Sequence, residues 1–300
     1  MRKKLISFSA LIISLLLAVS VCGCSSRGGP DAGSGSAAGS SAQSGDETSE
    51  ITTAEETSKE IEMTTVEETT SELHEGEVKR LRIATYNIKH AAEGEENIAS
   101  VIKAMGADIV GVQEVDYLNT RSGSRDQPRI IAKAAGMPYY RFTRAIDYKG
   151  GEYGTLILSK YPIVSYETVS LESGSYEGRA AGHAVIDVDG VLIDFVNTHL
   201  SYEDDSLRAT QLREVAALLY DSRRFVVTAD FNSANFFEFG VIGAATMVND
   251  YGREQVTFPS KSSSIDNILL SEGFEFTDSG TVIESFSDHR PLWADVILRP

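Results

Sequence analysis

The chain has 300 residues, of which 42% are hydrophobic, and a formal net charge of −17 at pH 7. This length and hydrophobic content suffice for one substantial globular domain or two small ones. Both cysteines, Cys22 and Cys24, lie near the start of the chain, so the rest of it cannot form a disulfide and must be stabilised by its hydrophobic core. The acidic charge disfavours binding to duplex DNA, because such binding depends on Lys and Arg side chains that neutralise phosphates.

Residues 1–24 have the plan of a secretory signal, with a basic start and an apolar run that is too short for a permanent membrane span. The run ends in VCGCSS, which resembles the lipobox of bacterial lipoproteins: an aliphatic residue and two small ones before the cysteine that receives a lipid. Cys24 fits that cysteine because the small Gly23 precedes it. We expect a secreted protein that is lipid-anchored through Cys24 to the outer face of the bacterial cell membrane. The alternative is an ordinary secreted protein that is cut nearby.

Residues 25–77 consist mainly of Ser, Thr, Gly, Ala and Glu and carry more than half of the net negative charge of the chain. Such a segment cannot bury enough apolar surface to offset the entropy of ordering, so we expect a disordered acidic tether. A flexible chain of this length has a root-mean-square span of roughly 40 Å, and charge repulsion extends it further. The tether would therefore lift the following domain away from a membrane.

The remaining residues, 78–300, alternate between strand-like and helix-like segments and show no internal repeat. Period-two alternation or a short apolar run indicates a strand, whereas a 3–4 spacing of apolar residues indicates a helix. Asp189 and Gly190 separate two alternating runs, which is the strongest local signal for a β-hairpin. Roughly ten strands with helices between the early ones predict an α/β fold of two packed sheets covered by helices. The predicted strands cover 80–88, 107–115, 139–146, 155–159, 163–171, the two arms of a hairpin within 182–200, 225–229, 265–270 and 293–298, and the predicted helices cover 98–105, 128–135 and 207–219.

Polar residues stand where the predicted apolar strands end. The ends of strands in stacked sheets gather along one rim, so residues far apart in the sequence can share a cleft there. The sequence therefore predicts one polar site built from several chain segments. Its candidate members are Asn87, Gln113, Glu114, Asn197, His199, Asp230, Asn232, Asp266, Asp288 and His289.

The residue types in this set suit metal-assisted chemistry. Glu114 is a hard carboxylate of the kind that binds Mg²⁺ or Mn²⁺, which take oxygen ligands and usually keep several waters. His289 and Asp266 could form an imidazole–carboxylate pair in which the acid fixes the tautomer and raises the pKa of the histidine. Asp230 could orient or deprotonate a water molecule. Zinc is disfavoured, because residues 78–300 contain no cysteine and no His-x-x-x-His spacing.

Between residues 81 and 298 the chain contains, in order, TYN, QE, YG followed by LILSKYPI, NTHL, DFN, SIDNIL and SDHRP. This ordered set resembles the endonuclease/exonuclease/phosphatase superfamily, which includes pancreatic deoxyribonuclease, abasic-site endonucleases, bacterial sphingomyelinases and inositol polyphosphate 5-phosphatases. The resemblance covers nearly the whole predicted domain. It implies a four-layered α/β/β/α sandwich in which helices cover two packed mixed β-sheets.

The resemblance also implies roles for individual residues in a metal-assisted, in-line attack of water on phosphorus. Glu114 would be the main metal ligand, with Asn87 and Asp288 near the ion. Asp230 would position or activate the attacking water beside Asn232. His289, oriented by Asp266, would stabilise charge on the phosphate. The further catalytic or substrate-binding groups would be His199, Tyr153 and Arg179.

Some positions leave alternatives open. Lys89 stands where some nucleases of this superfamily carry a metal-binding acid, which puts a second metal site in doubt. Arg179 would contact phosphate or form a surface salt bridge. His90 is expected to be a solvated loop residue, and Asn197 to be structural. The basic loop 119–127 would either clamp a substrate anion or form a solvated turn.

Three functional hypotheses follow. The first is a surface-tethered, divalent-metal-dependent phosphoesterase that acts, as a monomer, on a small or lipid-linked phosphate. The second is an extracellular nuclease, for which a basic rim would have to compensate for the acidic charge of the domain. That rim would consist of Arg121, Arg125, Arg129, Arg141, Arg144 and Lys149. The third is a binding module with an inactive site.

Overall fold

The computed structural model describes residues 78–299. The predicted signal peptide 1–24 with its lipid anchor at Cys24, and the predicted tether 25–77, lie outside the described residues and stay predictions. Within 78–299, no helix has both the length and the apolar character that crossing a membrane requires.

In the described part of the chain, twelve strands form two six-stranded sheets, with the orders β11-β12-β1-β2-β4-β3 and β5-β6-β7-β8-β10-β9. Both sheets are mixed, because β1 and β2 run parallel in the first and β7 and β8 run parallel in the second, whereas the other pairs are antiparallel. The elements are β1 (Lys79–Asn87), α1 (Glu95–Met105), β2 (Ile109–Tyr117), α2 (Gln127–Ala135), β3 (Tyr139–Tyr148), β4 (Gly151–Ser159), β5 (Ile163–Leu171), β6 (Arg179–Val188), β7 (Val191–His199), α3 (Asp205–Leu218), β8 (Phe225–Asp230), β9 (Thr246–Met247), β10 (Asp266–Leu270), β11 (Phe274–Thr281) and β12 (Leu292–Leu298), with short 3₁₀ helices η1 (Lys89–Ala91), η2 (Thr120–Ser122), η3 (Phe236–Ile242) and η4 (Pro259–Lys261).

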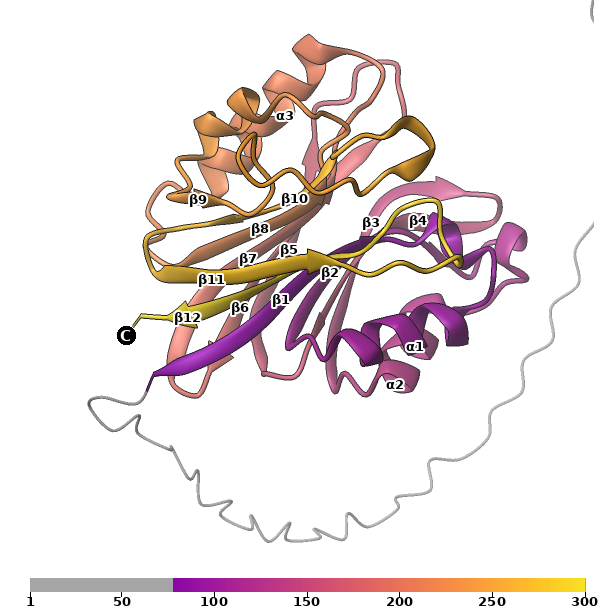
Figure 1. The fold of residues 1–300 in the computed structure, drawn as a ribbon. Helices are drawn as coiled ribbons and strands as arrows, with labels where there is room; N and C mark the ends of the chain where they lie inside the picture. Colours follow the sequence, from indigo (N-terminus) through magenta and orange to yellow (C-terminus); the bar gives the residue numbers. More distant parts are fainter. Residues whose placement is uncertain (1–77, 300) are drawn as a thin grey trace, which may run out of the picture. The chain divides into compact units, whose positions relative to one another are not determined.

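The two sheets pack face to face, with α1 and α2 on the outer face of the first and α3 on the outer face of the second (Figure 1). Three hydrophobic clusters fill the three interfaces between these layers. The middle cluster, which includes Ile83, Ile109, Phe195 and Val226, joins residues of both sheets. The predicted four-layered α/β/β/α sandwich is thus confirmed.

Strong local patterns identified their elements correctly. Asp189 and Gly190 form the hairpin turn between β6 and β7, and both have positive φ, as a tight hairpin turn requires. Strands β9 and β11 and the short 3₁₀ helices were not predicted from the sequence. Strand β11 lies at the edge of its sheet and most of its side chains are partly or fully exposed, so it shows no apolar pattern.

The two parallel strand pairs determine where the polar residues meet. Strands β1 and β2 end at Asn87 and just beyond Glu114, and strands β7 and β8 end at His199 and Asp230, which face each other in register. Because neighbouring parallel strands end at the same edge, each pair brings its polar ends to one rim. Antiparallel β10 begins at that rim, since Asp266 pairs with Asp230.

A buried polar network joins the two sheets beneath this rim. The Nε2 atom of Gln113 on β2 donates to Asn197 Oδ1 on β7 at 2.7 Å and to Thr85 Oγ1 at 3.0 Å. Asn197 Nδ2 in turn donates to the carbonyl oxygens of Val112 and Leu156, at 3.0 and 3.1 Å. Gln113 and Asn197 thus lie behind the site, in an inter-sheet position.

Gly111 on β2 makes this close approach of the sheets possible. A Cβ atom at this position would lie 2.0 Å from Thr228 Oγ1 and 2.5 Å from Asn197 Oδ1. We therefore expect Gly111→Ala to lower the free energy of unfolding by about 1 to 3 kcal/mol, the usual cost of overpacking a buried interface. Urea unfolding of the two proteins measures the difference. Gly240→Ala is the matched control, because a Cβ atom there meets no heavy atom within 4 Å; equal stability of all three proteins would contradict the expectation.

Candidate active site

The rim residues line one cavity of about 440 Å³. The first sheet contributes β2, the end of β3, the start of β4, the 3₁₀ helices η1 and η2, and the β11–β12 connection. The second sheet contributes the start of β6 with the residues before it, the ends of β7 and β8 with the residues after them, and the segment around η4 that precedes β10. The lining residues are Lys89, His90, Glu114, Arg121, Tyr148, Tyr153, Glu177, Arg179, His199, Tyr202, Asp230, Asn232, Phe258, Lys261, Ile265, Asp288 and His289. Most of them are charged or hydrogen-bonding groups, so the cavity suits a polar, charged ligand.

Glu114 is directed into the cavity by an irregularity of its strand. The pairing of β2 with β4 shifts between Val112 and Val115, and Glu114 has φ 59° in the left-handed region. Such a bulge re-aims a side chain at the end of a strand. Glu114 Oε1 accepts from Asn87 Nδ2 at 3.1 Å. Burial favours a raised pKa for Glu114, but the contact with His90 and the nearby imidazoles outweigh it and lower the pKa to about 2.

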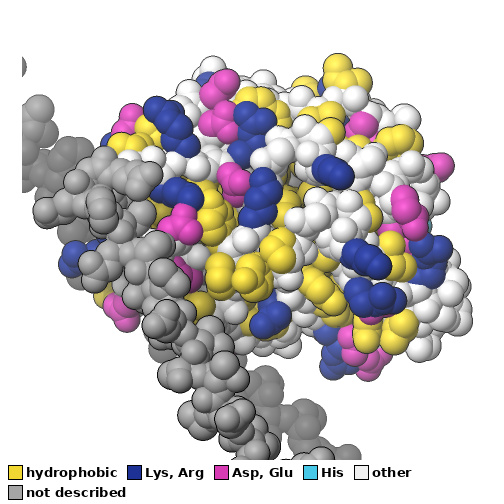
Figure 2. Space-filling view, turned by 90° about the horizontal axis from the view of Figure 1, so that it is seen from below, with side chains coloured by type: hydrophobic (Ala, Val, Ile, Leu, Met, Phe, Trp, Pro, Cys, Tyr) yellow, Lys and Arg dark blue, Asp and Glu magenta, His cyan; other side chains and the backbone are white. Residues whose placement is uncertain are grey.

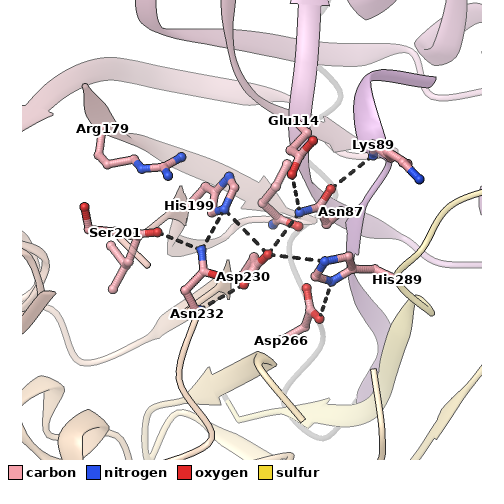
Figure 3. Close-up of polar contacts among 12 residues, drawn as sticks. Asn87, Lys89, Glu114, Arg179, His199, Ser201, Asp230, Asn232, Asp266 and His289 are labelled. Atoms are coloured by element: carbon pink, nitrogen blue, oxygen red, sulfur yellow. Dashed lines mark hydrogen bonds and ion pairs between the residues drawn. The ribbon is translucent and has the colours of Figure 1, made fainter. Parts of the chain in front are cut away.

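Asp230 lies at the centre of the arrangement and is almost fully buried (Figure 3). Its Oδ2 atom accepts from Asn87 Nδ2 at 3.0 Å and lies 3.6 Å from His199 Nε2 and 3.7 Å from His289 Nε2. Burial, together with the charge of Asp266, raises the pKa of Asp230 to about 7. A carboxylate with this pKa can accept a proton at neutral pH.

His289 and Asp266 form the imidazole–carboxylate pair expected from the sequence, with His289 Nδ1 2.8 Å from Asp266 Oδ2. The Ser287 hydroxyl fixes the loop that carries the histidine, because it donates to Asn87 O at 2.8 Å and accepts from His289 N at 3.3 Å. Burial alone would lower the pKa of His289, but the charge and hydrogen bond of Asp266 outweigh it and raise the pKa to about 10. His289 is therefore a cationic donor at neutral pH.

His199 has the opposite character. Its Nε2 atom lies 2.9 Å from Asn232 Nδ2, which can only donate, so His199 Nε2 is the acceptor. Burial, followed by the nearby charge of Arg179, lowers the pKa of His199 well below its ordinary value. The two imidazoles of the site thus differ in charge, since one is held neutral and the other cationic.

Two of the predicted metal ligands have other contacts in this structure. Asn87 directs its amide Nδ2 atom toward Glu114 and Asp230, while its Oδ1 atom accepts from Lys89 N at 3.1 Å. Asp288 Oδ2 lies 3.4 Å from Lys89 Nζ. Both residues adjoin the site, and their coordination of an ion stays a prediction.

Arg179 and Tyr153 both line the cavity, and Arg179 lies on the side of His199 (Figure 3). Arg179 is 4% exposed, its guanidinium NH1 atom is 2.8 Å from Glu177 Oε1, and its Nε atom has no hydrogen-bond partner within the described residues. The salt bridge that the sequence left open as an alternative therefore exists; its arginine is buried in the cavity wall, whereas the side chain of Glu177 is partly exposed. Burial and the charge of Glu114 raise the pKa of Tyr153, so its hydroxyl stays protonated and can donate.

No role was predicted from the sequence for several lining residues, which are Tyr148, Glu177, Tyr202, Phe258, Lys261 and Ile265. His90, expected in solvent, lines the cavity with its Nδ1 atom 4.0 Å from Glu114 Oε2. Arg121, in the basic loop, makes a bidentate contact with the buried carboxylate of Asp116 and lies 4.6 Å from the centroid of the Tyr148 ring. No motif signals these positions, because they depend on the path of loops and not on strand ends.

A divalent cation could bind at two positions in the site: at a cluster of three residues or at Glu114. Asp230, Asp266 and His289 place ligand atoms within 4.8 Å of one another, and Asp266 Oδ1 is buried without a hydrogen-bond partner in the described part of the chain. Glu114, by contrast, is partly exposed to the cavity and keeps lone pairs of Oε2 free for a cation. A hard ion that retains several waters is better suited to the open position at Glu114 than to a fully enclosed cluster whose histidine holds a proton.

This fold and this site define a class of protein: hydrolases that cleave phosphoester bonds with a divalent metal ion. The family model of the Endonuclease/Exonuclease/phosphatase family matches residues 84–289, so the chain belongs to that family. The family resemblance expected from the sequence is thereby confirmed.

Solved structures show the same fold. An endonuclease/exonuclease/phosphatase from Beutenbergia cavernae DSM 12333 superposes with a TM-score of 0.63 at 24% identity, over 74% of this chain and 72% of that one. Sphingomyelinase C from Streptomyces griseocarneus superposes with a TM-score of 0.53 at 19% identity, over 72% of this chain and 99% of that one. A curated relative, protein cwh43 of Schizosaccharomyces pombe, is 32% identical over 146 residues, which are 47% of this chain and 14% of that protein. The chain thus spans only a small part of the length of that relative.

Proposed function

We propose that this protein is a Mg²⁺-dependent phosphoesterase that hydrolyses a small or lipid-linked phosphate at the outer face of a bacterial cell membrane. Glu114 would hold the ion, with Asp288 near it. The signal and lipobox-like sequence that ends at Cys24 supports the location. A sphingomyelinase C shares the fold, and its name gives a lipid-linked phosphate as its substrate, which supports the substrate class.

One observation carries the proposal. Successive contacts of 3.1, 3.0 and 3.7 Å connect Glu114 through Asn87 and Asp230 to His289. These contacts place a carboxylate for the ion, a base and a cationic donor around one cavity, close enough to act on a single phosphate. The arrangement brings together residues of four separate chain segments, as the reaction requires.

Each of the central residues would have a separate role in the hydrolysis. The bound ion would supply positive charge that polarises the phosphate. Asp230 would accept a proton from the attacking water. Hydrogen bonds from Asn87 Nδ2 and from the backbone N–H of Asn232, at 3.0 and 2.9 Å, hold the carboxylate of Asp230 in place. His289, oriented by Asp266, would donate to a phosphate oxygen and stabilise the charge that develops there.

His199, Tyr153 and Arg179, which all line the cavity, would bind the substrate. Arg179 supplies a buried positive charge and Tyr153 a hydroxyl donor, while Asn232 holds the ring of His199. Together they would fix the phosphate in line with the water that Asp230 positions.

The nuclease alternative receives little support from the charges around the site. Of the basic rim proposed for it, Arg125 contacts Glu95 and Glu96, and Arg121, Arg129 and Arg144 each contact an aspartate. On the face shown in Figure 2, Lys and Arg side chains are interspersed with Asp and Glu. Nucleic acids need cations that are free to neutralise phosphates, and these cations are largely compensated.

A substrate screen tests the proposal. The full-length protein with Mg²⁺ is expected to hydrolyse bis(p-nitrophenyl) phosphate and the head group of phospholipid vesicles, measured by released product. Faster cleavage of plasmid DNA than of either, at about 0.15 M salt, would favour the nuclease. Absence of turnover with every phosphoester and every divalent ion would contradict both.

A further inference from the structure

The turn that follows β1 has an unusual backbone. Lys89, His90 and Ala91 have φ values of 46, 47 and 51°, so three successive residues other than glycine adopt the left-handed region. Residues other than Gly, Asn and Asp are disfavoured in this region, and several of them in succession are rare. A conformation of this kind persists only where the surrounding structure imposes it, and it occurs most often at functional sites.

Buried contacts impose it here. Gln127, which is 1% exposed, donates from Nε2 to His90 O at 2.8 Å and accepts from Asp116 N at 2.8 Å. Lys89 N donates to Asn87 Oδ1 at 3.1 Å, and the side chain of Ala91 is buried in the cluster beneath α1 and α2. The turn is therefore held from both sides and does not depend on a ligand for its shape.

The turn directs two side chains into the cavity. Lys89 Nζ lies 3.4 Å from Asp288 Oδ2, and His90 Nδ1 lies 4.0 Å from Glu114 Oε2. Each carboxylate expected near the metal ion thus has a nitrogen-bearing side chain from η1 beside it. The side chain of Lys89 is about half exposed and lines the cavity, so it can also contact a ligand.

We propose that Lys89 is a substrate-binding residue whose ammonium takes the place of a second divalent ion beside Asp288 and binds a non-bridging oxygen of the phosphate. This inference rests on the proposed function and deepens it. The site would hold one divalent ion, at Glu114, and Lys89 would be the second positive charge of the phosphate-binding site.

Charge and space both support this assignment. Phosphoesterases with two metal ions hold them about 3.5–4 Å apart, with carboxylates between them. At Asp288 such a position already has a cation at 3.4 Å, and a divalent ion would have to displace it against like-charge repulsion. A lysine is a compact, strongly hydrated charge on a flexible stem, so it can follow the phosphate as the substrate binds and leaves.

Two variants of Lys89 separate the loss of its positive charge from the gain of a carboxylate that can bind a metal ion. Lys89→Asn and Lys89→Asp have nearly the same shape, and both residues tolerate the left-handed backbone, so folding is expected to be preserved. Lys160→Gln is the matched control: Lys160 has similar exposure and contacts Asp108 Oδ1 at 3.0 Å, but it does not line the cavity. Isothermal titration of the full-length proteins with Mn²⁺, and then with inorganic phosphate in the presence of Mg²⁺, gives the ion stoichiometry and the phosphate affinity.

Wild type and Lys160→Gln are expected to bind one Mn²⁺ ion and to bind phosphate equally. Lys89→Asn should weaken phosphate binding by about tenfold, the loss of one charge-assisted contact, and should raise KM more than it lowers kcat. Lys89→Asp should bind a second ion. Two ions in wild type, or phosphate affinity of Lys89→Asn within twofold of wild type, would overturn the inference. Neither titration requires turnover, so both test the role of Lys89 even if no substrate is cleaved. A failure to cleave any substrate would contradict the proposed function and not the role of Lys89.

Discussion

Asp230→Asn and His289→Ala are each expected to lower kcat by at least about 10², the scale of a general base or of an electrostatic donor. The asparagine keeps the shape of the aspartate but cannot accept a proton from water. The alanine removes the cation that Asp266 orients at 2.8 Å. Steady-state kinetics with the best substrate of the screen, at saturating Mg²⁺, measures both losses.

The chain offers a matched control for this pair. His183 on β6 contacts Asp194 on β7, with His183 Nε2 2.7 Å from Asp194 Oδ1, and neither residue lines the cavity. Replacing His183 by Ala removes a similar imidazole–carboxylate contact and should leave kcat within about twofold of wild type, because its effect is on stability. Losses below tenfold in both Asp230→Asn and His289→Ala would show that the roles are assigned to the wrong residues.

Glu114→Gln is expected to weaken binding of the divalent ion by at least about 10²-fold, since even partners outside the coordination sphere change affinity by 10- to 100-fold. The amide has the same shape but lacks the negative charge, which is the main attraction for a hard cation. Mn²⁺ titration measures the affinity directly. The dependence of kcat on Mg²⁺ concentration should shift in parallel, so that high Mg²⁺ restores part of the activity.

Glu238→Gln is the control for the loss of a carboxylate charge. Its side chain is about as exposed as that of Glu114, 22% against 26%, and it contacts Arg208 at 3.1 Å outside the cavity. Its metal affinity should equal that of wild type. Unchanged affinity in Glu114→Gln, combined with lost affinity in Asp266→Asn, would place the ion in the cluster of Asp230, Asp266 and His289 instead.

Most site residues were accessible from the sequence because they terminate strands with clear apolar patterns. Asn87, His199 and Asp230 end buried strands, and the parallel pairing of those strands brings them to one rim. Their convergence follows from a general property of sheets and needs no knowledge of loop shape. The pairing of His289 with Asp266 was expected from the chemistry of the two side chains, and the structure brings them together because β10 begins at this rim.

Loop residues could not be found in this way. His90 was expected in solvent, yet Gln127, 37 residues along the chain, holds its carbonyl oxygen and keeps the turn in a left-handed conformation. A contact between residues so far apart in the sequence does not change the pattern of apolar residues in either segment, so the sequence does not reveal it. The orientation of Glu114 likewise depends on a bulge between β2 and β4, which alternation of apolar residues does not reveal.

The sequence by itself determined most strands and helices along the chain and the chemical types at the rim, because apolar periodicity and strand-end polarity are local properties of the chain. Only the tertiary structure decided how those groups are charged and which of them a phosphate can reach. Burial raises the pKa of Asp230 and lowers that of His199, while contact with Asp266 keeps His289 cationic. These shifts depend on desolvation and on charges from distant segments, and both exist only after the two sheets have packed together.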